Sequence, residues 1–218
     1  MSSTAASPAH RVLGDLAVPR RSRALALTVD AALVVAGTAL VAVAAQIAVP
    51  FWPVPLTAQT FAVLLVGTVL GPLRGAVSLA LYLVLGVVGL PIFSGGASGS
   101  LFALTTGGYI IGFVAAAALT GWLARRAWDR RVVGMFVTYL AGSVAIYAFG
   151  RPWRYVSLQG LGPSVWHGAR GYSSLLLATL GAGFVPFLLG DVAKAVFAAL
   201  LVPAAWKGVA VLDRRARD

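Results

Sequence analysis

Long apolar segments alternate with short polar ones along most of the chain. Six of them cover about residues 25–49, 56–70, 76–93, 108–123, 132–149 and 184–205. A helix that crosses a bilayer needs about 17–25 mainly apolar residues, so we predict an all-α integral membrane protein with about six transmembrane helices. A shorter apolar segment at 173–180 precedes the sixth and can lie in the membrane interface or dip into the protein.

The two ends of the chain lack this pattern. Residues 1–23 are rich in Ser, Ala, Pro and Arg without periodicity, which is typical of a mobile tail. We therefore divide the chain into an N-terminal cytoplasmic tail (1–23), a six-helix transmembrane domain (24–206) and a basic cytoplasmic C-terminal tail (207–218).

Positive residues cluster at the ends of the apolar segments. The net charge is +11, but arginines without interleaved stacking aromatics do not indicate a nucleic-acid partner. Most of them lie before the first segment, after the second, after the fourth and after the sixth: Arg11, Arg20, Arg21, Arg23, Arg74, Arg125, Arg126, Arg130, Arg131, Lys207, Arg214, Arg215 and Arg217. Because cytoplasmic loops carry the excess of Lys and Arg, we predict a multi-pass protein of the cell membrane with both termini in the cytoplasm. The third outer loop, 150–172, then holds Arg151, Arg154 and Arg170.

The composition supports membrane insertion and excludes several kinds of chemistry. Hydrophobic residues make up 60% of the chain and charged residues 11%, with a mean hydropathy of +0.91, against about 45–50% and about 25% in soluble domains. There is no cysteine and no glutamate, and the two histidines, His10 and His167, lie in the tail and in an outer loop. The sequence has no phosphate-binding G-x-x-x-x-G-K-[ST] loop and no G-x-S-x-G or H-E-x-x-H motif. We therefore expect no catalysis, no cofactor and no metal site.

Two charged residues, Asp191 and Lys194, lie inside the sixth segment. Their i, i+3 spacing puts both side chains on one helix face, and a charge at membrane depth is costly unless it is paired or faces a cavity. One interpretation is an ion pair that only neutralises itself. The other, which we favour, is a polar cavity for a small ligand that has both donors and acceptors. Asp30, near the start of the first segment, fits a helix-end residue that reaches water or Arg23.

Several weaker signals lie near the predicted outer ends of the helices. The outer loop 94–107 is rich in glycine, which lets backbone N–H and C=O groups approach a ligand closely, and Gly96 and Ser98 lie in it. Thr106 precedes the fourth segment, where a hydroxyl cap is expected. Gln59 begins the second segment, either as a solvated helix end or as a ligand contact.

Aromatic and small residues complete the candidates. Tyr82, Tyr109 and Tyr147 lie inside apolar segments. Their default role is packing or an interfacial belt, and one or two can still stack on a ligand ring. Ala32 and Ala36, four residues apart in the first segment, would let another helix approach closely.

Several motifs, taken in order, resemble one membrane family. They are PVPLTAQTFAVLL at 53–65, LGPLRG at 70–75, LYL at 81–83, GLPIF at 89–93, TGGY at 106–109, GF at 112–113, PF at 186–187 and GDVAKA at 190–195. Together they resemble the signature of the biotin-specific S component of energy-coupling factor transporters, the BioY family. Three positions depart from the family pattern. Thr105 and Leu189 stand where proline is common, and Ala97 or Ser98 stands where some members carry an asparagine.

The resemblance implies a compact six-helix bundle that binds biotin near its outer face. It implies that Asp191, Lys194 and the loop after the third helix contact the ligand. It also implies that a membrane coupling protein and a pair of ATPases drive uptake, and we expect Ala32 and Ala36 to form the docking surface for them. Solitary action, as a homo-oligomer, stays open.

We therefore predict a biotin-binding membrane subunit that is not an enzyme. The residues that we expect at the ligand are Asp191, Lys194, Gln59, Tyr82, Gly96, Ser98, Thr106 and Tyr109. An S component or solute carrier for another small vitamin would share the architecture and differ only in the lining of its cavity. An intramembrane enzyme with Asp191 as general base would lack a second catalytic group, and a structural subunit would bind no ligand.

Overall fold

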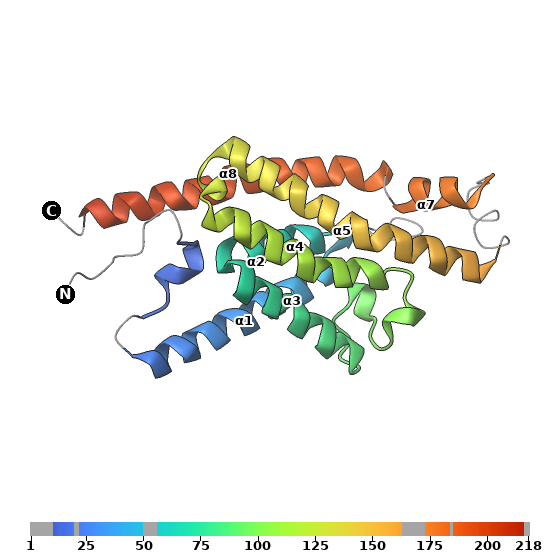
Figure 1. Ribbon diagram of the computed structural model, residues 1–218, viewed down its shortest axis with the longest axis horizontal. Coiled ribbons are helices and arrows are strands. Elements are labelled where there is room, and N and C mark those ends of the chain that lie inside the picture. The colour runs from blue at the N-terminus through green and yellow to red at the C-terminus, as the bar shows by residue number, and fades with distance from the viewer. Residues whose placement is uncertain (1–10, 20–21, 50–55, 163–172, 184, 216–218) are drawn as a thin grey trace.

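The protein folds almost entirely into helices that run roughly along its long axis (Figure 1). The computed structural model describes residues 11–19, 22–49, 56–162, 173–183 and 185–215. Its α-helices are α1 (Arg23–Gln46), α2 (Gln59–Leu70), α3 (Pro72–Val87), α4 (Gly107–Arg125), α5 (Val132–Leu161), α7 (Leu175–Gly183) and α8 (Val185–Arg215). The predicted all-helical class is confirmed, and the apolar segment at 173–180 forms a separate short helix, α7.

Short elements connect these helices. Strand β1 (Ala48–Val49) pairs antiparallel with β2 (Leu56–Thr57), and residues 50–55, the first predicted outer loop, lie outside the described residues. The 3-10 turns are η2 (Leu13–Leu16), η3 (Ser94–Gly96), η4 (Leu101–Ala103) and η5 (Trp128–Arg130).

Four of the described helical stretches are long and apolar enough to cross a membrane. They are Arg23–Gln46, Gly107–Arg125, Val132–Leu161 and Gly190–Arg215. Helices α2 and α3 are apolar but shorter, with 12 and 16 residues. At about 1.5 Å per residue, α2 reaches across only part of a hydrocarbon core that is about 30 Å thick.

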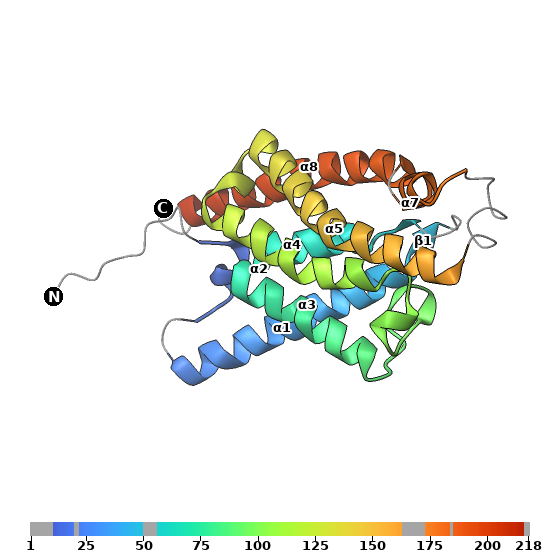
Figure 2. The same cartoon turned by 45° about the vertical axis from the view of Figure 1, so that its right-hand side comes forward.

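The helices alternate in direction, so their ends gather in two places. In Figures 1 and 2, α1 and α3 lie on one side, α5 and α8 on the other, and α2 and α4 between them. The start of α1, the turn between α4 and α5 and the end of α8 lie at one end of the molecule, which we call the basic end. Helix α7 and turn η4 lie at the opposite end, which we call the loop end.

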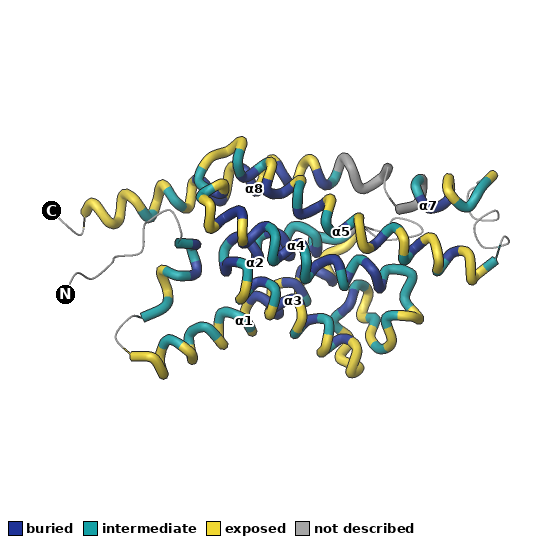
Figure 3. The backbone as a smooth tube through the Cα atoms, viewed as in Figure 1, coloured by how far each residue is buried: buried dark blue, intermediate teal, exposed yellow. Residues whose placement is uncertain are grey.

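Close helix contacts depend on glycine. A Cβ built on Gly108 of α4 would lie 2.3 Å from the Cβ of Trp153 in α5, and one on Gly150 would lie 2.4 Å from the ring of Tyr109. Because no side chain separates them, the two backbones approach directly, as small residues allow in membranes. Buried residues accordingly concentrate in the middle of the bundle, around α2 and the facing sides of α3, α4 and α5 (Figure 3).

Helix α5 is longer than predicted. We expected it to end near residue 149 and an outer loop to follow, but residues 150–161 continue the helix past Pro152. A proline inside a helix removes a hydrogen-bond donor. Packing compensates for this loss, because Trp153 lies against Gly107 and Gly108 while Arg154 and Leu158 are buried. Residues 163–172 of the predicted loop lie outside the described residues.

The segment before α1 is packed in the structure, whereas we predicted a mobile tail through residue 23. Val12 is fully buried, and the backbone N–H of Val12 donates to Asp15 in η2. The Arg130 guanidinium donates to the Arg11 carbonyl oxygen over 3.3 Å. Residues 1–10 and 216–218 lie outside the described part, and 207–215 of the predicted C-terminal tail extend α8.

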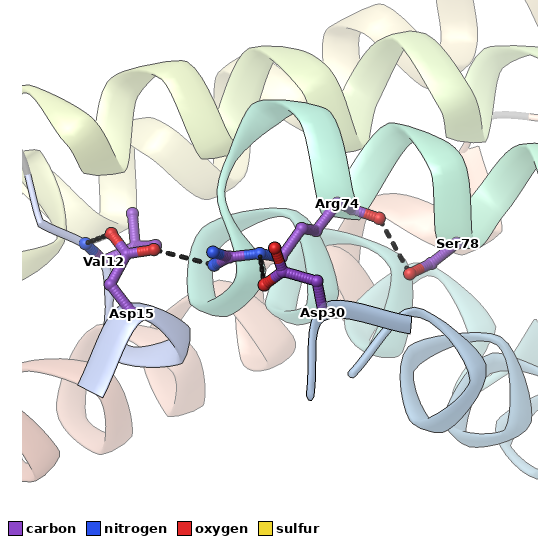
Figure 4. Close-up of polar contacts among 5 residues, drawn as sticks. All are labelled: Val12, Asp15, Asp30, Arg74 and Ser78. Atoms are coloured by element: carbon purple, nitrogen blue, oxygen red, sulfur yellow. Dashed lines mark hydrogen bonds and ion pairs between the residues drawn. The ribbon is translucent and has the colours of Figure 1, made fainter. Parts of the chain in front are cut away.

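An arginine near the basic end binds two carboxylates. The Arg74 guanidinium lies 2.7 Å from Asp15 Oδ1 and 2.7 Å from Asp30 Oδ1, so that it joins η2, α1 and α3 (Figure 4). We expected Asp30 to reach water or Arg23, and its partner is instead Arg74. We call this group of three residues the Arg74 clamp.

Candidate functional site

Asp191 is a buried carboxylate in the half of α8 that is nearer to the loop end. The residue is 4% exposed. The Tyr147 hydroxyl of α5 donates a hydrogen bond to Oδ2. Within the described residues Oδ1 accepts no hydrogen bond, and the Lys194 ammonium lies 3.8 Å from it. One oxygen of a buried carboxylate is therefore available as an acceptor.

Lys194 links α8 to the beginning of α2. Its ammonium donates to the Thr57 carbonyl oxygen and to the Thr60 hydroxyl, each over 2.8 Å. With Asp191 at 3.8 Å, its charge is shared between one carboxylate and two neutral oxygens. The ion-pair interpretation therefore describes only part of the arrangement, because the two charges approach each other but each makes its hydrogen bonds elsewhere. The interpretation as a ligand cavity stays a prediction.

Gln59 and Tyr82 form a buried hydrogen-bonded chain between α2, α3 and the following loop. The Gln59 side-chain amide donates to the Tyr82 hydroxyl over 2.7 Å, and that hydroxyl donates to the Ile92 carbonyl oxygen over 3.0 Å. Both side chains are buried, at 6% and 0% exposure. In this structure Gln59 is therefore not a solvated helix end, and its amide is linked through Tyr82 to the loop after α3. The predicted contact with a ligand stays a prediction.

The glycine-rich loop is fastened to the end of α1 by Gln46. The Gln46 side chain donates to the Phe93 carbonyl oxygen over 3.1 Å and accepts from the Gly96 N–H over 3.2 Å. Gly95 and Gly96 have φ values of 70° and 73°, a region that side chains other than glycine rarely adopt. Gly96 and Ser98 are exposed, so the loop is fixed at its base and open at its tip.

Tyr147 lies beside Asp191, and Tyr109 packs against Tyr147. Their ring centroids lie 6.3 Å apart in an edge-to-face arrangement, a favourable geometry for aromatic pairs. Thr106 is the N-cap residue of α4, as predicted, but its side chain makes no capping hydrogen bond. The Trp153 indole N–H donates to the Leu104 carbonyl oxygen just before α4, over 3.1 Å.

The predicted docking residues lie apart from these groups. Ala32 and Ala36 are exposed on α1, as is Val35 between them. In the described residues no group of three His, Asp or Glu side chains is arranged to hold a metal ion.

Comparison with known proteins identifies the family. The model of the BioY family matches residues 17–211. The chain belongs to the BioY family. The resemblance drawn from the motifs is therefore confirmed.

Relatives and a solved structure agree with this assignment. The biotin transporter BioY of Rhizobium etli is 35% identical over 178 residues, which cover 78% of this chain and 87% of that protein. The biotin transporter BioY of Thermotoga maritima is 36% identical over 169 residues, covering 75% and 88%. The crystal structure of the S component for biotin from an ECF-type ABC transporter superposes with a TM-score of 0.57 at 21% identity, covering 85% of this chain and 94% of that one. This last similarity shows a shared fold.

In this BioY-family chain, the structure brings together only part of the predicted site. Asp191 and Lys194 are adjacent, and Tyr109 reaches them through Tyr147. Gln59 and Tyr82 form a second group, while Gly96 and Ser98 belong to the loop and Thr106 to the start of α4.

Sequence reasoning missed three features of this region. Thr60 binds Lys194, Gln46 binds the glycine loop, and Arg154 lies in α5 rather than in a loop. Hydroxyls and amides are common at helix ends, so the sequence carried no signal for the first two. The sequence did carry a signal for Arg154, because Tyr147, Arg151 and Arg154 are spaced i, i+4 and i+7, which places them on one face of a helix.

Proposed function

We propose that this chain is the biotin-binding S component of a vitamin uptake transporter, which captures biotin outside the cell. Membership in a family whose relatives are named biotin transporters supports this proposal. The observation that carries it is the buried Asp191 carboxylate, one oxygen of which is held by Tyr147 while the other accepts no hydrogen bond within the described residues.

The chemistry of biotin suits this arrangement. Biotin has a ureido group with two N–H donors and one carbonyl, an apolar bicycle, and a flexible chain that ends in a carboxylate. A ureido N–H would donate to Asp191 Oδ1, a charge-assisted hydrogen bond of the stronger kind. The Tyr109 and Tyr147 rings beside it offer apolar surface for the bicycle, as in most small-molecule sites, where few polar groups are set in an apolar lining.

The remaining predicted residues would shape the site around this contact. Lys194 keeps the start of α2 next to Asp191. Gln59 and Tyr82 position the loop that carries Gly96 and Ser98, and the exposed tip of that loop would cover the bound ligand. Thr106 would contribute its hydroxyl, which makes no capping bond.

A competition experiment tests the function directly. The purified chain in detergent is incubated with radiolabelled biotin and an excess of unlabelled biotin or of one of several other vitamins. Only unlabelled biotin, or close analogues that keep the ureido ring, should displace the label. Displacement by a different vitamin would assign the site to that vitamin instead, and absence of biotin binding would overturn the proposal.

We further propose six membrane passes, with both termini in the cytoplasm. The four long apolar helices would each cross the membrane, and the shorter α2 and α3, together with the segments that adjoin them, would supply the other two passes. The basic residues near the start of α1, after α4 and at the end of α8 lie at one end of the molecule, which would face the cytoplasm.

A coupling protein and an ATPase pair would then drive uptake, because the sequence has no phosphate-binding loop of its own. The exposed pair Ala32 and Ala36 on α1 is the proposed docking surface. Small residues at this position let a partner helix approach closely.

A further inference from the structure

Arg154 is a guanidinium buried inside a membrane protein. It is 1% exposed and is the largest of the fully buried side chains in the described residues. Burying a cation is costly unless an anion or well-placed acceptors compensate, and charges at membrane depth typically mark ligand or ion sites. A residue of this kind in α5 needs a functional explanation that the Asp191 contact does not give.

Arg154 lies on the same helix face as the groups that reach Asp191. Tyr147, Arg151 and Arg154 are spaced i, i+4 and i+7, and the Arg151 guanidinium carbon lies 5.2 Å from the centroid of the Tyr147 ring. Gly150, one helical turn before Arg154, lies directly against the Tyr109 ring. Seven residues of helix rise by about 10 Å, so Arg154 lies about two turns beyond Tyr147 along α5, on the side of Tyr147 where Arg151 also lies.

Lys194 is not placed to serve as the cationic partner of a ligand carboxylate. Its ammonium donates to the Thr57 carbonyl oxygen and the Thr60 hydroxyl and adjoins Asp191. The cations that remain next to the tyrosine rings are on α5. Both guanidinium groups already interact with other groups of the chain, so a ligand carboxylate would add to those contacts or replace them.

We propose that Arg154, assisted by Arg151, forms the carboxylate subsite of the biotin site, while Asp191 takes the ureido end. This inference rests on the proposed biotin-binding function and assigns the orientation of the ligand within it. A guanidinium presents paired N–H donors in a plane, which matches the two oxygens of a carboxylate. The half-buried Arg151 is nearer to Tyr147 and would contribute mainly charge.

Biotinamide, in which a neutral amide replaces the carboxylate, distinguishes this role from a structural one. The affinities of biotin and biotinamide are measured for the purified full-length chain and for its variants. Arg154→Gln should weaken biotin binding by about ten- to a hundredfold and change biotinamide binding by less than about threefold. Arg154→Lys should fall between the two, and Arg151→Gln should show a smaller loss with the same selectivity. The exposed Arg125 at the end of α4 provides the control, and Arg125→Gln should change neither affinity.

Three results would overturn the subsite. Equal weakening of biotin and biotinamide by Arg154→Gln would make Arg154 a packing residue. If Arg154→Gln does not fold, unchanged preference for biotin over biotinamide in both Arg154→Lys and Arg151→Gln would also reject it. Wild-type protein that binds neither compound would remove the proposed function itself, an outcome distinct from the other two.

Discussion

The two charged groups at the two ends of the bundle are built in different ways. At the basic end, Arg74 makes ion pairs of 2.7 Å with both Asp15 and Asp30. Toward the loop end, Asp191 and Lys194 are 3.8 Å apart, although they share one helix face. In the Arg74 clamp the opposite charges contact each other directly. Asp191 and Lys194 instead make their hydrogen bonds with Tyr147, Thr57 and Thr60.

Under the proposed function, this difference separates a group that fastens the fold from one that would bind the ligand. The Arg74 clamp connects three segments of the chain, and the Arg74 carbonyl oxygen also accepts from Ser78 over 2.8 Å (Figure 4). By contrast, Asp191 keeps one buried oxygen without a hydrogen bond in the described structure. A buried acceptor in this state is costly, and binding of a donor would relieve the cost.

The largest expected effect tests whether biotin binding and docking of the coupling partners use separate surfaces of the chain. Replacing both Ala32 and Ala36 with Trp should abolish biotin uptake in cells, because the bulky rings would block a partner helix on α1. Biotin affinity of the purified variant should stay within about threefold of wild type, since neither residue adjoins Asp191. Co-purification of the coupling partners should be lost. Normal uptake by this variant, or uptake in cells that lack any coupling protein, would contradict docking on α1.

The second prediction concerns the group near the loop end. Asp191→Asn keeps an oxygen that can accept from Tyr147 but removes the charge, and Lys194→Ala removes the link to α2. Each should weaken biotin binding by about 1.5–3 kcal/mol, or roughly ten- to a hundredfold in dissociation constant. The matched control is Asp213→Asn, at an exposed position near the end of α8. Wild-type affinity in both site variants, measured with radiolabelled biotin, would show that the site lies elsewhere.

The sequence predicted the helices well because apolar length is a local property. All six apolar segments coincide with helices. The end of α5 was missed because Pro152 and two arginines indicated a loop, whereas the helix is kept by Trp153 against Gly107 and Gly108. That contact joins residues far apart in the chain, and periodicity does not reveal it.

The candidate site shows the same limit. Asp191 and Lys194 were found because charge at membrane depth is rare, but their partners lie on other helices: Tyr147 for Asp191, Thr57 and Thr60 for Lys194. Pairing between helices depends on how the bundle packs. For the same reason the sequence does not indicate that the partner of Asp30 is Arg74.

The third prediction removes the Arg74 clamp. Arg74→Gln breaks two partly exposed ion pairs, which should lower the free energy of unfolding by roughly 1 kcal/mol for each pair. The loss is measured as a lower melting temperature in detergent, while biotin affinity should not change. In a chain that already carries Asp15→Asn and Asp30→Asn, the same substitution should have little further effect. A clear loss of biotin binding by Arg74→Gln would break the distinction between the two ends.

The smallest effect is expected at a second carboxylate of the basic end, Asp129, in the turn between α4 and α5. The Trp206 indole N–H donates to its Oδ2 over 2.6 Å, and the Arg130 guanidinium lies 4.4 Å from the Trp206 ring centroid. Asp129 is fully buried. Burial raises the pKa of the Asp129 carboxyl, although the bond from Trp206 and the charge of Arg130 oppose the increase.

This raised pKa sets the sign of a pH dependence. The folded chain holds the Asp129 proton more readily than the unfolded chain, so the contribution of this group to stability is fully present below the unfolded pKa and is lost as pH rises through the folded pKa. Asp129→Asn keeps an acceptor for Trp206 but cannot ionise. We therefore expect the melting temperature of Asp129→Asn to match wild type near about pH 4 and to exceed it by a small margin at neutral pH. Trp206→Phe, which removes the donor that favours the charged form, should make the pH dependence steeper than in wild type. Parallel melting curves for wild type and Asp129→Asn across this range would contradict the prediction, because they would mean that folding does not raise the pKa of the Asp129 carboxyl.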